Sequence, residues 1–381
     1  MKINRRQFAL GSAALALSPT AFAQGLFRVP DGVKYRSALL HLGMNMWGGY
    51  RAPGEPVDPD LKYGKSRCLF DEGVWRRTTA LMQKRRFNHA VIDLGGGVEL
   101  QSHPELTLPG SFTPQQMRDE VARLSSMGIE AVPKLNFSAC HDAWLGIYER
   151  MLSTPKYYRV VEDVIADACE MFGNPRTFHI GLDEEDGVHG AKDPVMAVRC
   201  GELWWHDFEF LLKTVEKHGA QPIFFSGSAW YRNKDEFFRR VPKSVILNAG
   251  SYGSFTSKEE WIARLRKEYG KIPRLKQKMN KPFQFREYAD RGYRLLTCVS
   301  NWVNVADKTK YPKIEFGENY PRNRESIACI QRYIASEMPD ANIVGGMVAP
   351  WTMLDQKHED YWRDAINNLA DSCEELGWVG A

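Results

Sequence analysis

The chain has 381 residues, of which 43% are hydrophobic and 26% are charged, and its formal net charge is +4 at pH 7. This length suits one large α/β domain or two smaller ones, and the nearly balanced charge gives no support for nucleic acid as a partner. Seven cysteines occur singly, without a CxxC motif, so their spacing assigns no disulfide.

The N-terminus has the features of an export signal. Residues 4–10 (NRRQFAL) carry a twin-arginine pattern, an apolar run too short to span a bilayer follows, and residues 21–23 (AFA) form a small-x-small cleavage site. We expect a twin-arginine signal peptide at residues 1–23 and a periplasmic or secreted mature protein of residues 24–381. Removing the signal takes away three basic residues and no acidic one, which leaves a net charge of +1 and no membrane span.

The rest of the chain alternates between strand-like and helix-like patterns. The predicted strands are short apolar runs at residues 37–44, 89–94, 129–136, 178–182, 221–226, 245–248, 293–300 and 343–349. The predicted helices are amphipathic runs at residues 71–86, 113–127, 157–172, 201–218, 322–336 and 358–376, with two more between residues 251 and 292. Eight strands separated by helices predict a single-domain (β/α)8 TIM barrel of the α/β class. An open doubly wound sheet is the alternative.

The predicted fourth strand ends in four consecutive carboxylates, residues 183–186 (DEED). Packing like charges together costs free energy, and carboxylates at the C-terminal ends of barrel strands are typical of catalytic sites. Adjacent strand residues point to opposite faces, so Asp183 and Glu184 can reach one pocket only if the strand bends or stops there, which Gly181 favours. Such a pair would raise the pKa of one carboxyl and make it a proton donor. A solvated acidic turn is the alternative.

Aromatic and polar residues stand at the ends of several other predicted strands. Indole rings stack on the C–H faces of sugars, and planar polar groups bind sugar hydroxyls. We expect the following residues to contact an oligosaccharide or polysaccharide substrate: Trp47, Asn136, His141, Trp144, His179, Trp230, Trp302 and Trp351. Trp75, Trp204 and Trp261 lie in helical patterns and are expected in the core.

A metal site is the competing interpretation of the acidic run. The side chains that could ligate an ion are His179, Asp183, Glu185, Asp186 and His189. Their spacing matches neither the HExxH nor the EF-hand pattern. We therefore expect no metal and no cofactor.

Three motifs resemble the catalytic domain of glycoside hydrolase family 20, the β-N-acetylhexosaminidases. Residues 179–184 (HIGLDE) are similar to the family's His-x-Gly-Gly-Asp-Glu motif at the end of the fourth strand. Residues 132–136 (VPKLN), followed by His141, resemble its third strand, and residues 350–352 (PWT) resemble the end of its last strand. The similarity spans most of residues 36–376.

The resemblance implies roles for individual residues. Glu184 would be the general acid/base, and Asp183 would hold the 2-acetamido group, whose carbonyl oxygen acts as the internal nucleophile. His179 would support this pair, and Trp351 would belong to the aromatic wall around the sugar. No metal or cofactor is implied.

The chain departs from the family pattern where the family binds the sugar. The changed positions are Leu182 for the second Gly, Lys134 and Asn136 for two acids, residues 45–47 (NMW) for an Arg, Met353 for a Glu, and Asn301 and Trp302 where a Tyr is expected. These changes predict a related hydrolase with a different specificity. The alternatives are a non-catalytic carbohydrate-binding barrel and a metal-dependent polysaccharide hydrolase or lyase.

Overall fold

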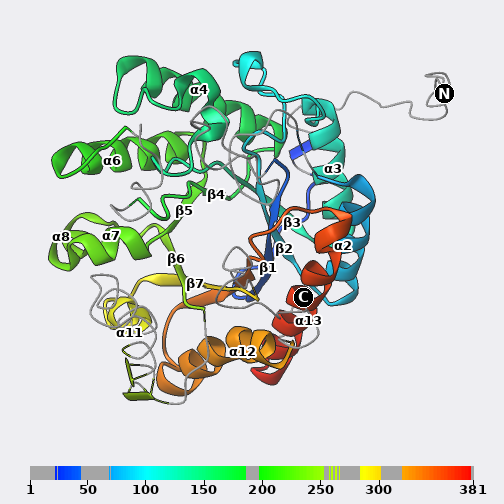
Figure 1. Cartoon of the computed structure of the whole chain (residues 1–381), viewed down its shortest axis with the longest axis vertical. Helices are drawn as coiled ribbons and strands as arrows, with labels where there is room; N and C mark the ends of the chain where they lie inside the picture. The colour runs from blue at the N-terminus through cyan, green and yellow to red at the C-terminus, as the bar shows by residue number, and fades with distance from the viewer. Residues whose placement is uncertain are drawn as a thin grey trace.

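The computed structural model describes residues 22–23, 25–43, 68, 70–185, 197–252, 257, 259–260, 262–263, 266, 284–301 and 320–378, without the side chains of residues 320–323. Eight parallel strands form a closed barrel in which each strand pairs with the next and β8 pairs with β1 (Figure 1). The strands are β1 Tyr35–His41, β2 His89–Asp93, β3 Glu130–Lys134, β4 Thr177–His179, β5 Gln221–Phe225, β6 Ile246–Gly250, β7 Arg294–Val299 and β8 Ile343–Val348. The predicted (β/α)8 barrel is confirmed, and the open doubly wound alternative is wrong.

Helices surround the barrel (Figure 1). The α-helices described are α2 Glu72–Lys84, α3 Pro114–Ser126, α4 Pro155–Met171, α6 Glu202–Lys217, α7 Gly227–Arg232, α8 Lys234–Arg240, α11 Gln284–Ala289, α12 Tyr320–Glu337 and α13 Glu359–Glu375. Short 3₁₀ helices are η1 Pro104–Leu106, η2 Ala143–Tyr148 and η5 Gln356–His358. At the start of α3, Thr113 and Gln116 form a reciprocal capping box and Pro114 takes the first helical position, as the sequence predicts. The helices α7 and α8 were not predicted.

The hydrophobic core has two parts, one between the barrel and the helices and one inside the barrel. Strands buried on both faces need apolar residues at consecutive positions, which explains why the strands read as continuous apolar runs. Trp75 and Trp204 lie in the outer part, as expected, and Trp261 is outside the described residues. Among the described residues, no helix combines the length and the apolar character needed to cross a bilayer.

Several strands end earlier than their sequence patterns predict, and the ends of β3 and β4 determine the site. β4 covers only residues 177–179 because Gly181 and Leu182 take left-handed backbone angles, with φ of 72° and 69°. β3 ends at Lys134 rather than at Asn136, so Asn136 lies in the loop that follows. The bend expected after β4 is therefore present and begins before the carboxylates.

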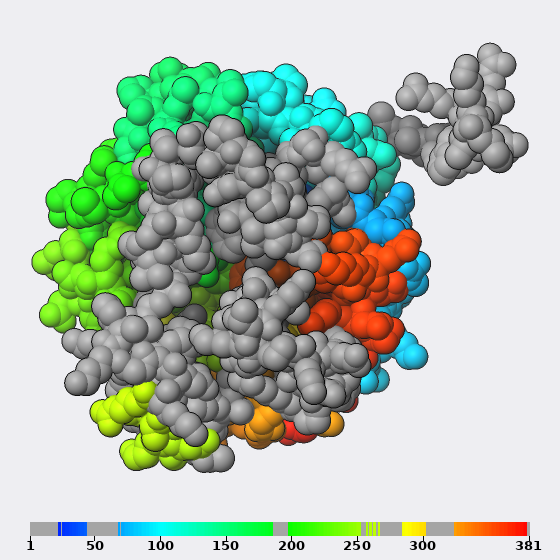
Figure 2. Space-filling model, in the orientation of Figure 1, coloured from blue at the N-terminus to red at the C-terminus, as the bar shows by residue number. Residues whose placement is uncertain are grey.

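The space-filling view shows described helices at the margins of one face of the molecule (Figure 2). In Figure 2 the green surface of α6, α7 and α8 and the red surface of α13 lie on opposite sides of this face. The C-terminal ends of the strands, and the residues that follow them, carry the candidate site.

Candidate active site

The backbone after β4 folds back on itself so that two consecutive carboxylates meet one histidine. Glu184 has φ of 58°, a third left-handed residue after Gly181 and Leu182. Each such non-glycine residue costs about 1–3 kcal/mol, and the surrounding contacts must compensate for that cost. A Cβ atom at Gly181 would lie 2.1 Å from Oδ1 of Asn136, so the close approach of the two loops requires glycine there.

His141, in the loop after β3, lies against both acids. Its Nε2 is 3.3 Å from Oε2 of Glu184 and 3.6 Å from Oδ2 of Asp183. The Asp183 side chain is 19% exposed and the Glu184 side chain is 38% exposed, whereas His141 is buried. The buried imidazole thus connects two carboxylates that both remain accessible to a ligand.

Asn136 fixes the loop geometry that brings these groups together. Its Nδ2 donates a 2.7 Å hydrogen bond to Oδ1 of Asp183. Its Oδ1 accepts hydrogen bonds from the backbone N–H groups of Ser138 and Leu182, each at 3.1 Å. One buried amide therefore ties the loop after β3 to the bend after β4 and orients the Asp183 carboxylate.

An aromatic group lies at the same end of the barrel. The indole Nε1 of Trp351 donates a 3.0 Å hydrogen bond to the hydroxyl of Tyr252, and the Trp351 ring lies 5.8 Å from the Phe225 ring, centroid to centroid. Burial raises the pKa of Tyr252 well above its ordinary value, and Cys298 and the negative charge of Asp183 raise it further. Tyr252 therefore stays protonated and lies within the electrostatic influence of Asp183.

A row of polar residues crosses the barrel interior beneath the acids. His41, Asp93, Lys134 and His179 are in register on β1 to β4. Nζ of Lys134 is 2.5 Å from Oδ2 of Asp93, and Nδ1 of His41 is 3.3 Å from the same oxygen. Burial by itself would raise the pKa of Asp93, but Lys134 and His41 outweigh it and hold that pKa well below the usual range. Asp93 thus neutralises the charge of Lys134, which replaces an acid of the resembled family.

His179 acts on the bend after β4 rather than on a ligand. Its Nδ1 accepts the Gly181 N–H at 3.0 Å, and its Nε2 is 3.4 Å from Oδ1 of Asn248. Burial, followed by the charge of Lys134, lowers its pKa to about 3, so the imidazole is neutral. His179 is completely buried and supports the turn, which corrects the expectation that it contacts the substrate directly.

Two tryptophans expected on the substrate-binding face belong to the outer core instead. Trp144 is 3% exposed and its Nε1 donates to the Asn136 carbonyl, while Trp230 is 2% exposed and its Nε1 donates to Glu287. Trp144 lies in η2 and Trp230 in α7, whose apolar faces pack towards the barrel. Trp47 and Trp302 are outside the described residues.

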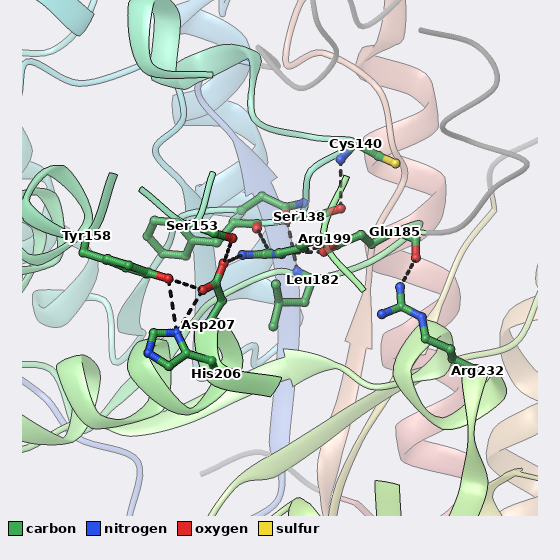
Figure 3. A network of polar contacts seen from close by, with 12 residues as sticks. Ser138, Cys140, Ser153, Tyr158, Leu182, Glu185, Arg199, His206, Asp207 and Arg232 are labelled. Carbon is green, nitrogen blue, oxygen red and sulfur yellow. Dashed lines mark hydrogen bonds and ion pairs between the residues drawn. The ribbon is translucent and has the colours of Figure 1, made fainter. Parts of the chain in front are cut away.

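Glu185, the third acid of the run, is buried and pairs with the buried Arg199 (Figure 3). Burial alone would lower the pKa of Arg199, but Glu185, Tyr157 and Asp207 raise it well above the usual value, so its charge is retained. Sequence patterns did not single out this arginine, because its pairing depends on contacts between separate loops. Tyr252 lies two residues after the end of β6, so a search for aromatic residues just after strands selects it.

The acidic run provides no cluster of metal ligands within the described part of the chain. Glu185 is paired with Arg199 and His179 with Asn248, and no group of three or more His, Cys, Asp or Glu side chains among the described residues is arranged to hold an ion. Asp186 and His189 are outside the described residues.

Comparison with known proteins finds related folds but no related sequence. No protein-family model matches the chain, and no curated protein matches it in sequence. A β-N-acetylhexosaminidase from Bacteroides fragilis is similar in structure, with 14% identity and a TM-score of 0.56 over 90% of this chain and 65% of the other. A GH20 exo-β-N-acetylglucosaminidase from Vibrio harveyi, solved with N-acetylglucosamine, has 16% identity and a TM-score of 0.54 over 90% and 54%.

A third similar structure is a mutant Streptomyces plicatus β-hexosaminidase in complex with its GlcNAc product. It has 14% identity and a TM-score of 0.52, over 90% of this chain and 64% of the other. The chain thus spans between half and two thirds of the length of these three proteins. The three comparisons show a GH20-like fold.

Proposed function

We propose that the protein is a glycoside hydrolase that cleaves a β-glycosidic bond in a glycan containing an N-acetylhexosamine. The observation that carries this proposal is the meeting of Asp183 and Glu184 at one His141 nitrogen, at the end of the barrel where such enzymes hold their acids. The fold shared with three β-hexosaminidases supports the substrate class. Trp351 and Tyr252 are the described residues that we assign to the sugar, together with Trp47 and Trp302, while the buried Asn136 orients Asp183.

In the proposed first step, Glu184 donates a proton to the glycosidic oxygen as the bond to the anomeric carbon breaks. The carbonyl oxygen of the substrate's acetamido group attacks that carbon and forms a cyclic oxazolinium ion, whose positive charge Asp183 stabilises. In the second step, Glu184 takes a proton from the water that attacks the anomeric carbon, and the acetamido group is restored. The products are two sugars with the anomeric configuration retained.

The test is turnover of aryl β-glycosides and oligosaccharides with and without a 2-acetamido group. Glu184→Gln should lower kcat by about 10²–10⁴-fold on substrates whose leaving group needs a proton, because it removes the general acid. Glu216→Gln, on the exposed face of α6, is the matched control and should leave turnover unchanged.

Other outcomes would select a different function. Oligosaccharide binding without turnover would identify a carbohydrate-binding barrel. Turnover that a chelator abolishes would identify a metal-dependent enzyme. Equal turnover of sugars with and without the acetamido group would contradict the role proposed for Asp183.

A further inference from the structure

The residue next to the proposed acid is held in a buried ionic cluster (Figure 3). The guanidinium of Arg199 makes a two-pronged contact with Glu185, with Nε 2.8 Å from Oε1 and Nη2 3.1 Å from Oε2. Its Nη1 lies 3.0 Å from Oδ2 of Asp207. The side chain of Arg199 is 1% exposed, so these contacts are shielded from solvent.

The same arginine connects loops that are distant in the sequence. Its Nη2 donates a 2.6 Å hydrogen bond to the Phe137 carbonyl, one residue beyond Asn136. Nη2 of Arg232, from α7, donates at 2.5 Å to the backbone carbonyl of Glu185. Both the side chain and the carbonyl of Glu185 are therefore fixed, directly after the left-handed residue Glu184.

The cluster also sets the charge beside the active site. Arg199 contacts two carboxylates, Glu185 and Asp207. Asp207 also accepts hydrogen bonds from the hydroxyls of Ser153 and Tyr158, at 2.7 and 2.6 Å. The other titratable or charged groups that face the cluster are Asp142 and Glu149 around η2, Tyr157 on α4, His206 on α6 and Arg232 on α7. Burial, and then the charge of Glu149, raises the pKa of Asp142 well above its usual value.

We propose that Arg199 is a positioning residue for Glu184, which acts by clamping Glu185 away from the substrate and neutralising its charge. This inference rests on the proposed function, because it assigns a role relative to the general acid. It explains how Asp183 and Glu184 can act at the site although a third carboxylate follows them directly. Arg199 binds the third, Glu185, and neutralises its charge.

The clamp predicts the direction in which the pH–rate profile moves when either partner of the ion pair is replaced. The alkaline limb of the pH–rate profile records loss of the proton from the general acid. Arg199→Met leaves the charge of Glu185 unbalanced, which favours the protonated acid and should move this limb to higher pH. Glu185→Gln removes one negative charge from the cluster, in which Arg199 keeps Asp207 as its partner, and should move the limb to lower pH. Each shift should be about half a pH unit or more. The double variant should return it close to wild type.

Position and charge can be separated with Arg199→Lys. The lysine retains the charge but cannot form the two-pronged contact or reach Asp207 and Phe137 at once. We expect the alkaline limb to stay near wild type while kcat falls about tenfold, since a small misplacement of the acid is costly. Arg240→Lys, on α8, is the control for an arginine that also pairs with glutamates but lies outside the cluster.

The second readout does not need activity. The carboxyl titration of Glu184 is followed by NMR in protein carrying ¹³C-labelled glutamate, with Glu184→Gln identifying the signal. Opposite displacements of this titration in Arg199→Met and Glu185→Gln support the clamp. A titration that stays in place in every variant that folds overturns it, even if thermal stability falls.

Failure of the clamp and failure of the proposed function are therefore distinguishable. A wild-type protein without glycosidase turnover, or turnover that survives Glu184→Gln, overturns the proposed function, whereas a Glu184 titration that stays in place in an active protein overturns only the clamp. If Arg199→Met does not fold, Glu185→Gln and Arg199→Lys still decide the question, because each retains a polar side chain in the cluster.

Discussion

Two histidines buried inside the barrel predict how stability depends on pH. Burial lowers the pKa of His89 to about 4 and that of His179 to about 3, both below the ordinary value of 6.5. Between pH 6.5 and 4 the unfolded chain therefore binds protons that the folded protein does not. The free energy of unfolding should fall as the pH decreases through this range, by up to about 1.4 kcal/mol per pH unit for each histidine.

Urea unfolding at several pH values between 7 and 4 measures this slope. His89→Gln should reduce it, because glutamine does not titrate and can still reach Ser37. A free energy of unfolding that stays constant from pH 6.5 to 4.5 would contradict the prediction.

At the scale of the element, the bend after β4 assembles the site. Its residues leave the extended conformation before the carboxylates, so alternate residues no longer point to opposite faces. The loop after β3 fills the space opposite, with Asn136 against Gly181. The two loops therefore form a single unit, and a change at their contact should affect stability and catalysis together.

Gly181→Ala tests this contact against a matched glycine. Gly128 has almost the same backbone angle, φ of 73° against 72°, but apart from its own chain neighbours no heavy atom lies within 4 Å of where its Cβ would be. Gly128→Ala should therefore lower the free energy of unfolding by about 1–2 kcal/mol, the cost of holding alanine in the left-handed conformation, and should leave turnover normal. Gly181→Ala should cost more and lower kcat by at least about tenfold, because Asn136 must move.

Thermal unfolding and kcat of the two variants provide the measurement. If both lose the same stability and both keep normal turnover, the contact between the loops does not position the acids.

At the scale of the whole molecule, the N-terminal segment is anchored at the barrel end opposite the site. The N–H of Val29 donates at 2.6 Å to Glu130 at the start of β3, and Arg176 just before β4 donates to the Val29 carbonyl at 2.7 Å. Arg28 reaches the Gly173 carbonyl at 3.1 Å. These contacts belong to residues beyond the expected cleavage point, so cleavage there leaves them intact.

We propose that residues 1–23 direct export through the twin-arginine route and are then removed. Arg5→Lys combined with Arg6→Lys should keep the full-length chain in the cytoplasm of the producing cell. N-terminal sequencing and cell fractionation measure this, and a mature chain beginning at Gln24 is expected for the unaltered protein. Normal export of the doubly substituted protein would contradict the proposal.

The (β/α)8 barrel and the bend before the acids could be predicted because both follow from local patterns. A strand buried on both faces must be apolar along its length, and a glycine before an acidic run favours a bend. The eight apolar runs predict the barrel, and residues 181–184 predict a bend before the acids, whereas the orientation of Asp183 depends on its tertiary contact with Asn136. The structure confirms the barrel and shows both carboxylates at one histidine.

Only the tertiary structure decided which side chains reach the site. Trp144 and Trp230 follow strands in the sequence, yet they lie in short helices whose apolar sides pack into the outer core. Glu185 leaves the site because Arg199, 14 residues away, meets it inside the molecule, and Tyr252 meets Trp351 across 99 positions. Periodicity reports the face of an element, whereas the direction of a loop side chain depends on partners that only folding brings together.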